Sequence, residues 1–566
     1  MKELDIGNSD FKSLIENNNY FVDKSFLIKE VIKSQKQVLL FPRPRRFGKT
    51  LNLSMLKYFF DINQKNEPNL FTELDIWNDT EEIKQKYAKY PIIFLSFKDT
   101  KEETWDKCYE LIKEEIAELH TNYSFLVEGD FLAENEKQEF INIMFKTASQ
   151  STFEISLKKL CKYLYKYYNQ KVVLLIDEYD TPLHAGYKNF YENAVSFMRN
   201  LLSGAFKDNN FLYKGVITGI LRVSKESIFS GLNNISVYSV LDDKFSDCFG
   251  FTENETKKIL KDFKVTTAYQ DIKKWYDGYK FGNTTDIYNP WSILNYAIEF
   301  KSGFKPFWVN TSADKLLREQ LKDPKEDSIR EQLYQLINNK TIEKSINENF
   351  IFPDLDYDSE LIWSLLVYSG YLTIVNKLDI NEYSLKIPNY EISIVFKNII
   401  IDWLKFEVKI KQFLLIETTK YLVNNQIADF EKGFKEIIGD TFSYFDTGVE
   451  PEKVYQSYIL GLLAIIGDDY IIKSNRESGE GRYDILLIPN DKKKYGIVIE
   501  IKQLKRIRAE KKENLIKRIN IKIQEAKIQI DENKYFKELI DNKVDNIIKL
   551  PIIFAGKEPY ITLIDK

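Results

Sequence analysis

The sequence predicts a multidomain α/β protein, with a parallel sheet covered by helices, a mostly helical middle region and a second α/β unit. Three observations predict this class. The chain has 566 residues, more than one hydrophobic core supports. Apolar strands alternate with helices in its N-terminal part, a pattern typical of a parallel sheet. Further apolar strands appear near the C-terminus, after a long helical stretch rich in Tyr, Trp and Asn.

The N-terminal part, which we place at residues 1–245, carries the alternation that predicts the parallel sheet. Helical stretches separate apolar segments suited to buried strands, which occur at 38–41, 91–97, 171–178 and 211–220. Because strands buried on both faces are apolar throughout, these continuous runs favour a sheet with helices on both faces.

Two further regions follow, at residues 246–445 and 446–566. The first is mostly helical. Its segment 365–389 indicates a helix end, two short strands and a helix, which fits a winged-helix-like module or an irregular helical lid. The second has a leading helix, long charged helices and strands at 481–488, 495–501 and 551–557. This region is therefore predicted to be another α/β unit.

Composition and charge exclude several classes of protein. The net charge of −4 excludes a globally basic nucleic-acid coat. The cysteines lie too far apart for a disulfide framework or a CxxC zinc site, and they fit a reducing compartment: Cys108, Cys161 and Cys248. The N-terminus lacks a basic segment followed by an apolar core, and the longest strongly apolar run, about residues 458–467, is far shorter than a membrane span. We therefore expect a cytoplasmic protein with no membrane segment.

The segment RPRRFGKT, residues 43–50, lies between an apolar strand and a helix. N–H groups at a helix N-terminus bind phosphate oxygens, so we expect a phosphate-binding loop that includes Arg46 and Gly48. Lys49 would neutralise the β- and γ-phosphates of ATP, and the Thr50 hydroxyl would ligate Mg²⁺. Arg43 stands at the first position, where the usual pattern has Gly, so the loop is an imperfect match.

An acidic pair at the end of a buried strand favours nucleotide binding over a structural turn. Asp177 is placed to hold Mg²⁺ through water, and Glu178 to orient the hydrolytic water. Thr218 ends the strand at 211–220, where a polar residue could sense the γ-phosphate. Arg222 follows, either as a phosphate-contacting arginine or as a surface arginine in a loop. Together these residues predict a P-loop NTPase that uses ATP and Mg²⁺, and a homo-oligomer is required if Arg222 acts on a neighbouring subunit.

A second constellation, of two carboxylates and a lysine, lies near the C-terminus. Asp484 begins one strand, while Glu500 and Lys502 occupy alternate positions of the next and so face the same side. A short turn brings Asp484 beside them. Such a set can bind one or two Mg²⁺ ions, or Mn²⁺ in their place, activate water and stabilise a phosphoryl transition state. A surface hairpin with alternating charges is the alternative.

A basic stretch follows this constellation. Residues 502–527 hold ten Lys and Arg against three Glu, which suits a nucleic-acid backbone, or else forms a solvated helix face. Gln529 could extend the site, and Glu452 could supply a further carboxylate.

These motifs resemble a group of prokaryotic proteins with an N-terminal AAA-ATPase-like domain and a C-terminal PD-(D/E)XK nuclease domain, which has a restriction-endonuclease-like fold. The resemblance spans nearly the whole chain. It rests on YFVDKSFLIKE, RPRRFGKTLNLSML, LLIDEYDTP, ITGILRVSKESIFSGLNN, WYDGYKFG with IYNPWSIL, YSGYLT, and GRYDILLI with VIEIK. An arginine at position 43 is similar to the group's own pattern, whereas Pro42 departs from it.

The resemblance implies roles for the residues in both sites. It implies ATP binding by Lys49, Thr50, Asp177 and Glu178. It implies metal binding and catalysis by Asp484, Glu500 and Lys502.

The leading hypothesis is an ATP-regulated nuclease, with DNA rather than RNA as the expected partner. In it the middle region, including Trp275 to Gly278, relays the nucleotide state, although packing is the favoured explanation of these aromatic residues. The alternative is a nucleotide-dependent switch or interaction protein whose nuclease fold is inactive. A processive motor such as a helicase is disfavoured, because no helicase motif series is visible.

Overall fold

The computed structural model describes residues 2–67, 69–221, 234–308, 327–337, 339–406, 412–442, 459, 463, 466, 469–478, 481–507, 510–556 and 558–562. The chain forms two compact units. Unit 1 comprises Met1–Trp308 and Glu343–Glu391, and unit 2 comprises Val309–Ile342 and Ile392–Lys566. The three-part division with boundaries at 245 and 445 stays a prediction, and its middle region has residues in both units.

Unit 1 is built mainly from helices packed on one parallel sheet. Its helices are α1 (Phe11–Glu16), α2 (Phe26–Lys33), α3 (Lys49–Phe60), α4 (Glu81–Lys84), α5 (Trp105–Thr121), α6 (Glu134–Met144), α7 (Gln150–Glu154), α8 (Ser156–Tyr168), α9 (Thr181–Gly186), α10 (Tyr191–Phe206), α11 (Glu253–Asp262), α12 (Tyr269–Tyr276), α13 (Pro290–Glu299) and α16 (Leu361–Ser369). Its strands are β1 (Val38–Pro42), β2 (Ile92–Ser96), β3 (Val172–Asp177), β4 (Leu212–Gly219), β5 (Ile235–Val237), β6 (Tyr279–Phe281), β7 (Thr284–Ile287), β9 (Thr373–Lys377) and β10 (Glu382–Lys386). Short 3-10 helices span Ile62–Asn66, Asp75–Asn78, Ser124–Val127, Phe300–Ser302 and Phe352–Asp356.

Unit 2 contains a second sheet with flanking helices. Strand β8 (Ile342–Ser345) and helix α17 (Tyr390–Phe406) each begin in one unit and end in the other. The remaining elements of unit 2 are α15 (Asp327–Ile337), α18 (Gln412–Val423), α19 (Ile427–Phe442), β11 (Tyr470–Ser478), β12 (Gly481–Pro489), β13 (Tyr495–Leu504), α21 (Lys512–Glu532), α22 (Lys537–Asp541), β14 (Asn546–Ala555) and β15 (Glu558–Ile561).

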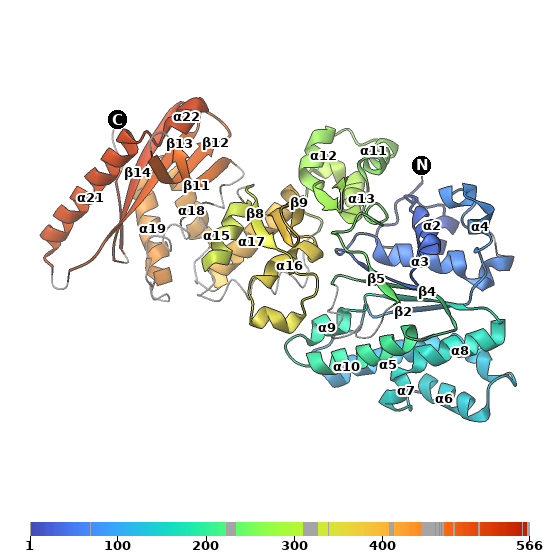
Figure 1. Cartoon of the computed structure of the whole chain (residues 1–566). Helices are drawn as coiled ribbons and strands as arrows, with labels where there is room; N and C mark the ends of the chain where they lie inside the picture. Colours follow the sequence, from blue (N-terminus) through green and yellow to red (C-terminus); the bar gives the residue numbers. More distant parts are fainter. Residues whose placement is uncertain are drawn as a thin grey trace. The chain divides into compact units, whose positions relative to one another are not determined.

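The main sheet of unit 1 has five parallel strands in the order β2-β3-β4-β1-β5. Helices α2 and α3 lie on one face of it, and α5, α8 and α10 lie on the other (Figure 1). Strand β4 lies between β1 and β3, so the carboxyl ends of these three strands meet at one edge. The sheet confirms the predicted architecture. Strand β5 was not predicted, since three residues are too short to give a period-two pattern.

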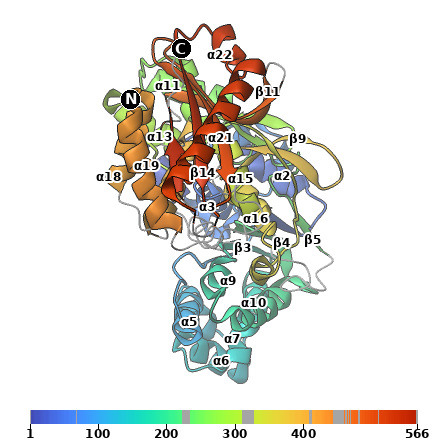
Figure 2. The same ribbon diagram turned by 90° about the vertical axis from the view of Figure 1, so that its left-hand side faces the viewer.

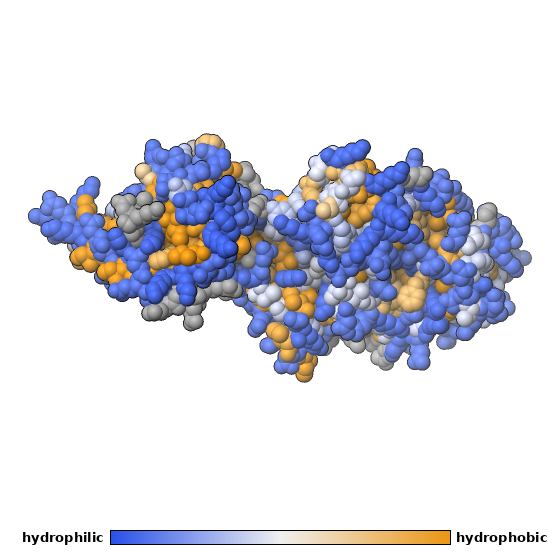
Figure 3. Space-filling model, turned by 90° about the horizontal axis from the view of Figure 1, so that it is seen from above, coloured by the Kyte–Doolittle hydropathy of each residue, from blue (hydrophilic) through white to orange (hydrophobic). Residues whose placement is uncertain are grey.

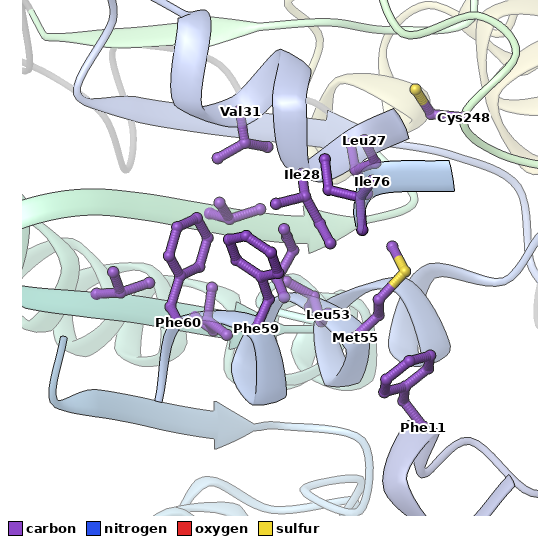
Figure 4. Packing of buried hydrophobic residues seen from close by; sticks show 14 of the residues in the cluster. Phe11, Leu27, Ile28, Val31, Leu53, Met55, Phe59, Phe60, Ile76 and Cys248 are labelled. Atoms are coloured by element: carbon purple, nitrogen blue, oxygen red, sulfur yellow. The ribbon is translucent and has the colours of Figure 1, made fainter. Parts of the chain in front are cut away.

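The core beneath α2 and α3 is aromatic and aliphatic. Leu27, Ile28 and Val31 line one face of α2 at helical spacing, and they meet Phe59 and Phe60 of α3. In Figure 4 these side chains point into the space between the two helices and the sheet. Each such side chain contributes about 1.5–3 kcal/mol when fully buried, so this layer fixes α3 and the loop that precedes it.

Helices α6 and α7 form an outer layer of unit 1. They lie farther from the sheet than α5 and α10 in both views (Figures 1 and 2). Ion pairs connect this layer to α8, including Lys162 with Glu136 at 2.7 Å and Lys166 with Glu136 at 2.8 Å.

The middle part of the chain is helical with small sheets. As expected for residues 365–389, helix α16 is followed by the antiparallel hairpin β9–β10 and then by α17, and β8 pairs with β10 to complete a three-stranded sheet. The hairpin β6–β7 was not predicted. Among the residues that the structure describes, no helix is long and apolar enough to cross a membrane. The face shown in Figure 3 is mostly hydrophilic, with separate hydrophobic patches.

The sheet of unit 2 has the order β11-β12-β13-β14-β15. Strands β13 and β14 are parallel, and the other neighbours are antiparallel. Helix α21 packs on β13 and β14. Its buried residues Ile519, Ile523, Ala526 and Ile530 recur at the spacing of one helix face. Its lysines lie outside that face, with Lys512 and Lys517 exposed.

Candidate functional site

The predicted phosphate-binding loop, residues 43–50 and called the phosphate loop below, leaves β1 after Pro42 and enters α3 at Lys49. Two of its residues have left-handed backbone conformations, Arg46 at φ 66° and Gly48 at φ 81°. A β-carbon at Gly48 would meet no atom within 4 Å, so the backbone angle alone is the reason for glycine. The turn presents the first N–H groups of α3, which lack partners within the helix, toward the loop.

Lys49 is buried at the centre of this loop. Its Nζ donates to the carbonyl oxygens of Arg43 at 3.1 Å and Pro44 at 3.0 Å. Burial lowers the pKa of Lys49, and the negative charges of Glu178, Asp177 and Asp180 oppose this shift. These carboxylates therefore offset only part of the effect of burial on the pKa of the Lys49 ammonium.

Thr50, Asp177 and Thr218 form a hydrogen-bonded cluster at the edge of the sheet. Thr50 Oγ1 donates to Asp177 Oδ2 at 2.7 Å, and Thr218 Oγ1 donates to Asp177 Oδ1 at 2.5 Å. The cluster forms because β4, which carries Thr218, lies between the loop strand β1 and the acidic strand β3. Burial raises the pKa of Asp177, and the two hydroxyl donors oppose the rise. The structure thus brings together three residues predicted from separate motifs.

Glu178 follows β3 with a left-handed backbone, at φ 49°. Its side chain is half-buried, and Thr181 Oγ1 lies 3.4 Å from Glu178 Oε2. It lines the same cavity as the phosphate loop. A strained backbone at a non-glycine residue beside a ligand cavity is a common feature of functional sites.

Asp180 and Tyr179 were missed in the sequence, although both belong to the motif IDEYDTP. Asp180 is buried and accepts hydrogen bonds from the backbone N–H groups of Ile220 at 2.8 Å and Leu221 at 3.0 Å. The Tyr179 hydroxyl donates to the carbonyl of Leu221 at 2.9 Å. Burial raises the pKa of Asp180. This pair fixes the chain where it leaves β4, immediately before Arg222, which lies outside the described residues.

Arg43, at the first loop position, is fully buried behind the loop. Its guanidinium donates to the carbonyl oxygens of Pro42 at 2.9 Å, Tyr238 at 2.6 Å and Phe245 at 3.1 Å. It also lies over the ring of Phe249, 5.0 Å from the centroid. Burial lowers the pKa of Arg43 to about 10. The arginine holds the loop against the core, so the imperfect match in the motif reflects packing behind the loop.

Phe47 of the loop packs against strand β6. Phe47 packs edge-on against Tyr279, with ring centroids 5.0 Å apart, and lies 5.4 Å from Phe281. The motif WYDGYKF therefore supplies packing for the loop, as favoured from the sequence. Gly278 in this motif has φ 107°, and a β-carbon there would lie 1.9 Å from the carbonyl oxygen of Pro388, which explains the glycine.

A cavity of about 260 Å³ opens beside the loop. Gly48, Lys49 and Thr50 line one part of it. Apolar walls come from the N-terminal segment and from the region around α13, including Phe21, Phe251, Trp291 and Leu294. The contribution of the N-terminal segment was not predicted, because nothing in residues 4–22 marks a ligand site.

The second site lies on the hairpin β12–β13. The register pairs Ile485 with Ile499, so the next position places Asp484 opposite Glu500 on the same face. Asp484 Oδ2 accepts a hydrogen bond from the backbone N–H of Ile501 at 2.7 Å. Lys502 Nζ donates to Glu500 Oε1 at 2.8 Å. The expected proximity of the three residues is therefore present.

Burial distinguishes these residues from a surface hairpin. Glu500 is only 1% exposed, although Lys502 reaches solvent. Within the described part of the chain, no group of three or more His, Cys, Asp or Glu side chains is arranged to hold a metal. Glu452, the further carboxylate considered from the sequence, lies outside the described residues.

The basic stretch after β13 is partly neutralised. Arg518 pairs with Glu510 at 2.9 Å, and Lys522 pairs with Glu525 at 2.5 Å. The Gln529 amide donates to the Tyr535 hydroxyl at 2.9 Å, an interaction within the packing of α21. The exposed face of α21 also carries apolar side chains, including Ile521 and Ile528.

Comparisons with known proteins match two separate parts of the chain. Residues 5–229 match the model of a family described as predicted AAA-ATPase, and residues 450–562 match that of the PD-(D/E)XK nuclease superfamily. These matches confirm the two-part layout and, with the two sheets, the predicted P-loop NTPase and nuclease-like folds.

Individual relatives are distant. An uncharacterized protein in the vnfD 5′ region of Azotobacter chroococcum mcd 1 is 26% identical over 402 residues, which cover 69% of this chain and 68% of that protein. A solved structure, of a Walker-type ATPase from Pyrococcus abyssi, is 11% identical with a TM-score of 0.36, and the match covers 70% of this chain and 98% of that one.

Proposed function

Because the chain joins a predicted AAA-ATPase domain to a PD-(D/E)XK nuclease superfamily domain, we propose that it is an ATP-regulated, metal-dependent nuclease. ATP binds and is hydrolysed in unit 1, and phosphodiester bonds of nucleic acid, DNA in preference to RNA, are cleaved in unit 2. The observation that most directly supports ATP binding and hydrolysis in unit 1 is the cluster of Thr50, Asp177 and Thr218 beside the buried Lys49.

The donor set of unit 1 fits Mg²⁺. Thr50 and Asp177 offer a hydroxyl and a carboxylate, the hard oxygen ligands that Mg²⁺ prefers. Bound Mg²⁺ would neutralise charge on the β- and γ-phosphates. Lys49 would donate to the β- and γ-phosphates, in competition with the loop carbonyls that it contacts. Glu178 would orient the attacking water, and Thr218 would hold Asp177 in place.

The cavity supports a nucleotide rather than inorganic phosphate as the ligand. Its phosphate-loop residues lie next to apolar and aromatic side chains, including Phe21, Trp291 and Leu294. A nucleoside base has flat apolar faces suited to such walls, while the phosphates need the charged loop. We therefore propose that the N-terminal segment and α13 enclose the nucleoside.

The donor set of unit 2 fits a divalent metal. Asp484 and Glu500 are paired carboxylates on one face of the hairpin, and either Mg²⁺ or Mn²⁺ is compatible with oxygen ligands. A metal held there would polarise the scissile phosphate and lower the pKa of its bound water. Lys502 would place a positive charge beside the developing negative charge, and Glu500 would keep the lysine in that position.

A nucleotide-dependent switch with an inactive nuclease fold is the competing function. The absence of a third carboxylate at the site, within the described residues, favours it. The burial of Glu500 argues against it, since a buried carboxylate is costly to keep without a function, even beside the partly exposed Lys502.

The proposal is tested by incubating the full chain with plasmid DNA and, separately, single-stranded RNA, with Mg²⁺ or Mn²⁺ and with or without ATP. We expect metal-dependent cleavage that ATP alters. Glu500→Gln should abolish cleavage, while Glu532→Gln, at the exposed end of α21, should not.

Lys49→Ala provides the second arm. It should weaken ATP binding and abolish the effect of ATP on cleavage, whereas Lys57→Ala, two turns along α3, should leave both intact. ATP turnover without cleavage of either nucleic acid under any metal condition would contradict the nuclease function and support the nucleotide-dependent switch.

A further inference from the structure

The outer side of the phosphate loop is hydrogen-bonded to the segment where the chain leaves unit 1. Arg46 Nη1 donates to the carbonyl oxygen of Phe307 at 2.9 Å, and the indole N–H of Trp308 donates to the carbonyl oxygen of Arg45 at 3.3 Å. The guanidinium of Arg46 also lies 4.2 Å from the centroid of the Trp291 ring. Loop and exit segment therefore contact each other in both directions, each donating to the other.

A buried glutamate joins this exit segment to a second one. Glu391 Oε1 accepts from the backbone N–H of Trp308 at 2.8 Å, and Oε2 accepts from the hydroxyl of Ser292 on α13 at 2.8 Å. Glu391 is 1% exposed. Burial raises the pKa of Glu391 to about 7, while its hydrogen bonds to Ser292, Trp308 and Phe307 and the nearby charge of Arg46 lower it.

These residues coincide with the boundaries of the two units. The chain passes from unit 1 to unit 2 after Trp308 and again after Glu391, which are two of its three crossings. Trp308 and Glu391 are thus the last residues of unit 1 on two separate segments, and a hydrogen bond joins them. Glu391 itself lies in the first turn of helix α17 (Tyr390–Phe406), which continues into unit 2.

We propose that the state of the phosphate loop is passed to unit 2 through Phe307, Trp308 and Glu391. This inference rests on the proposed ATP binding in unit 1, and it does not require nuclease activity. Lys49 donates to the carbonyls of Arg43 and Pro44, and a bound phosphate competes for those donors. Loss of these bonds changes the loop directly before Arg45 and Arg46, the residues that hold the exit segment.

The packing of Pro44 favours passing a loop movement on to Trp308 over a movement confined to the loop. Pro44 lies against the end of α16, where a β-carbon on Gly370 would be 2.9 Å from Pro44 Cβ. Tyr371, next along the chain, packs edge-on against Trp308 with ring centroids 4.8 Å apart. A closely packed arrangement deforms little, so a loop movement is passed on to Trp308.

The test is hydrogen–deuterium exchange of the full chain with and without ATP and Mg²⁺, read at residues 392–406 of α17. In the wild-type protein we expect ATP to change exchange there by roughly fivefold or more, the lower end of typical couplings between sites. Trp308→Phe removes the indole donor to Arg45 and keeps an aromatic ring against Tyr371. Glu391→Gln replaces the carboxylate that joins the two segments.

Both variants should bind a fluorescent ATP analogue as the wild type does and lose most of the change in α17. Trp77→Phe, which removes an indole that packs on Tyr87 away from the loop, is the matched control and should retain it. Ser292→Ala, which removes only one donor to Glu391, provides a milder third variant if either of the others unfolds early in thermal denaturation.

Wild-type protein that binds ATP without any change at α17 would overturn the inference, as would variants that keep the full change. Failure of the wild type to bind ATP would overturn the proposed function and this inference together. Absence of nucleic-acid cleavage alone would remove the nuclease and leave the coupling in place.

Discussion

The two candidate sites both use a buried carboxylate on a strand, but they hold it in different ways. Asp177 accepts hydrogen bonds from hydroxyls on two other elements, α3 and β4. Glu500 is bonded by Lys502, two residues further along its own strand. The first arrangement depends on the order of strands in a sheet, and the second on the register of one hairpin.

This difference teaches which changes each site tolerates. The phosphate site requires β4 to lie between β1 and β3, so it forms only when the whole sheet is in place. The carboxylate–lysine site requires that Asp484 stay opposite Glu500. Since a slip of one residue moves a side chain to the other face of a sheet, its assembly depends on the turn between β12 and β13.

The largest expected effects come from changing one carboxylate in each site. Asp177→Asn should reduce ATP turnover by roughly a thousandfold, because several kcal/mol of charge stabilisation depends on a held metal. Asp484→Asn should reduce metal-dependent cleavage by a similar factor and leave ATP turnover unchanged. Both rates are measured on both variants, and loss of ATP turnover in Asp484→Asn would show that the two sites are not separately assembled.

Arg43 tests how strongly the phosphate site depends on its support. Arg43→Met should lower the free energy of unfolding by about 3 kcal/mol, since three buried carbonyl oxygens lose their donor. Arg45→Met, on the half-exposed neighbour, should change it far less. Denaturant unfolding measures both. Equal effects would mean that the buried guanidinium contributes no more than a surface one.

Gly370 tests the contact between the loop and α16. Gly370→Ala should destabilise the protein by about 2 kcal/mol, because it combines a φ of 86° with a close approach to Pro44. Gly48→Ala is a matched control with a similar backbone, φ 81° and ψ 18°, and no atom within 4 Å of the added carbon, and it should cost about 1 kcal/mol. Thermal unfolding of the pair isolates the steric part, which is zero if the two shifts agree.

The smallest expected effect is a pH dependence of stability that arises from the buried Glu391. Burial raises the pKa of Glu391 from its ordinary value of 4.5 to about 7, so the folded state favours the neutral carboxyl. The stability that this gives is lost as the pH rises from about 4.5 through about 7. Relative to Glu391→Gln, the wild type should lose about 1 kcal/mol between pH 6 and 8.

The comparison between these two proteins cancels other groups that titrate in the same range. Burial also raises the pKa of Asp277 to about 7, and this carboxyl is present in both. Glu382→Gln, at the exposed first position of β10, should follow the wild-type curve. Parallel curves for wild type and Glu391→Gln would assign the pH dependence elsewhere.

The sequence predicted the parts of the fold that depend on local pattern. The four longer strands of the first sheet and the hairpin with Asp484 and Glu500 follow from continuous or alternating apolar residues. The cluster of Thr50, Asp177 and Thr218 was predictable because parallel strands end at the same edge. Their catalytic and binding roles, and those of Arg46, Gly48, Lys49 and Glu178, remain proposals.

The rest could not be predicted because it depends on contacts between distant segments. Glu391 is a single glutamate at the start of a helix, and only the fold brings it to Ser292 and Trp308. The burial of Arg43 results from carbonyls about 200 residues away in the chain. Asp180 had a visible signal, its place two residues after the acidic pair, but its bonds to the backbone after β4 had none.

The burial of Arg43 has a consequence for recognising related proteins. The residue at the first loop position does not line the cavity beside the loop. It lies against the carbonyls of Tyr238 and Phe245 and the ring of Phe249. The residue type at this position therefore depends on the groups that pack behind the loop. Among related sequences it should be exchanged together with Phe249, and a search pattern that requires glycine there would reject proteins that build the same loop.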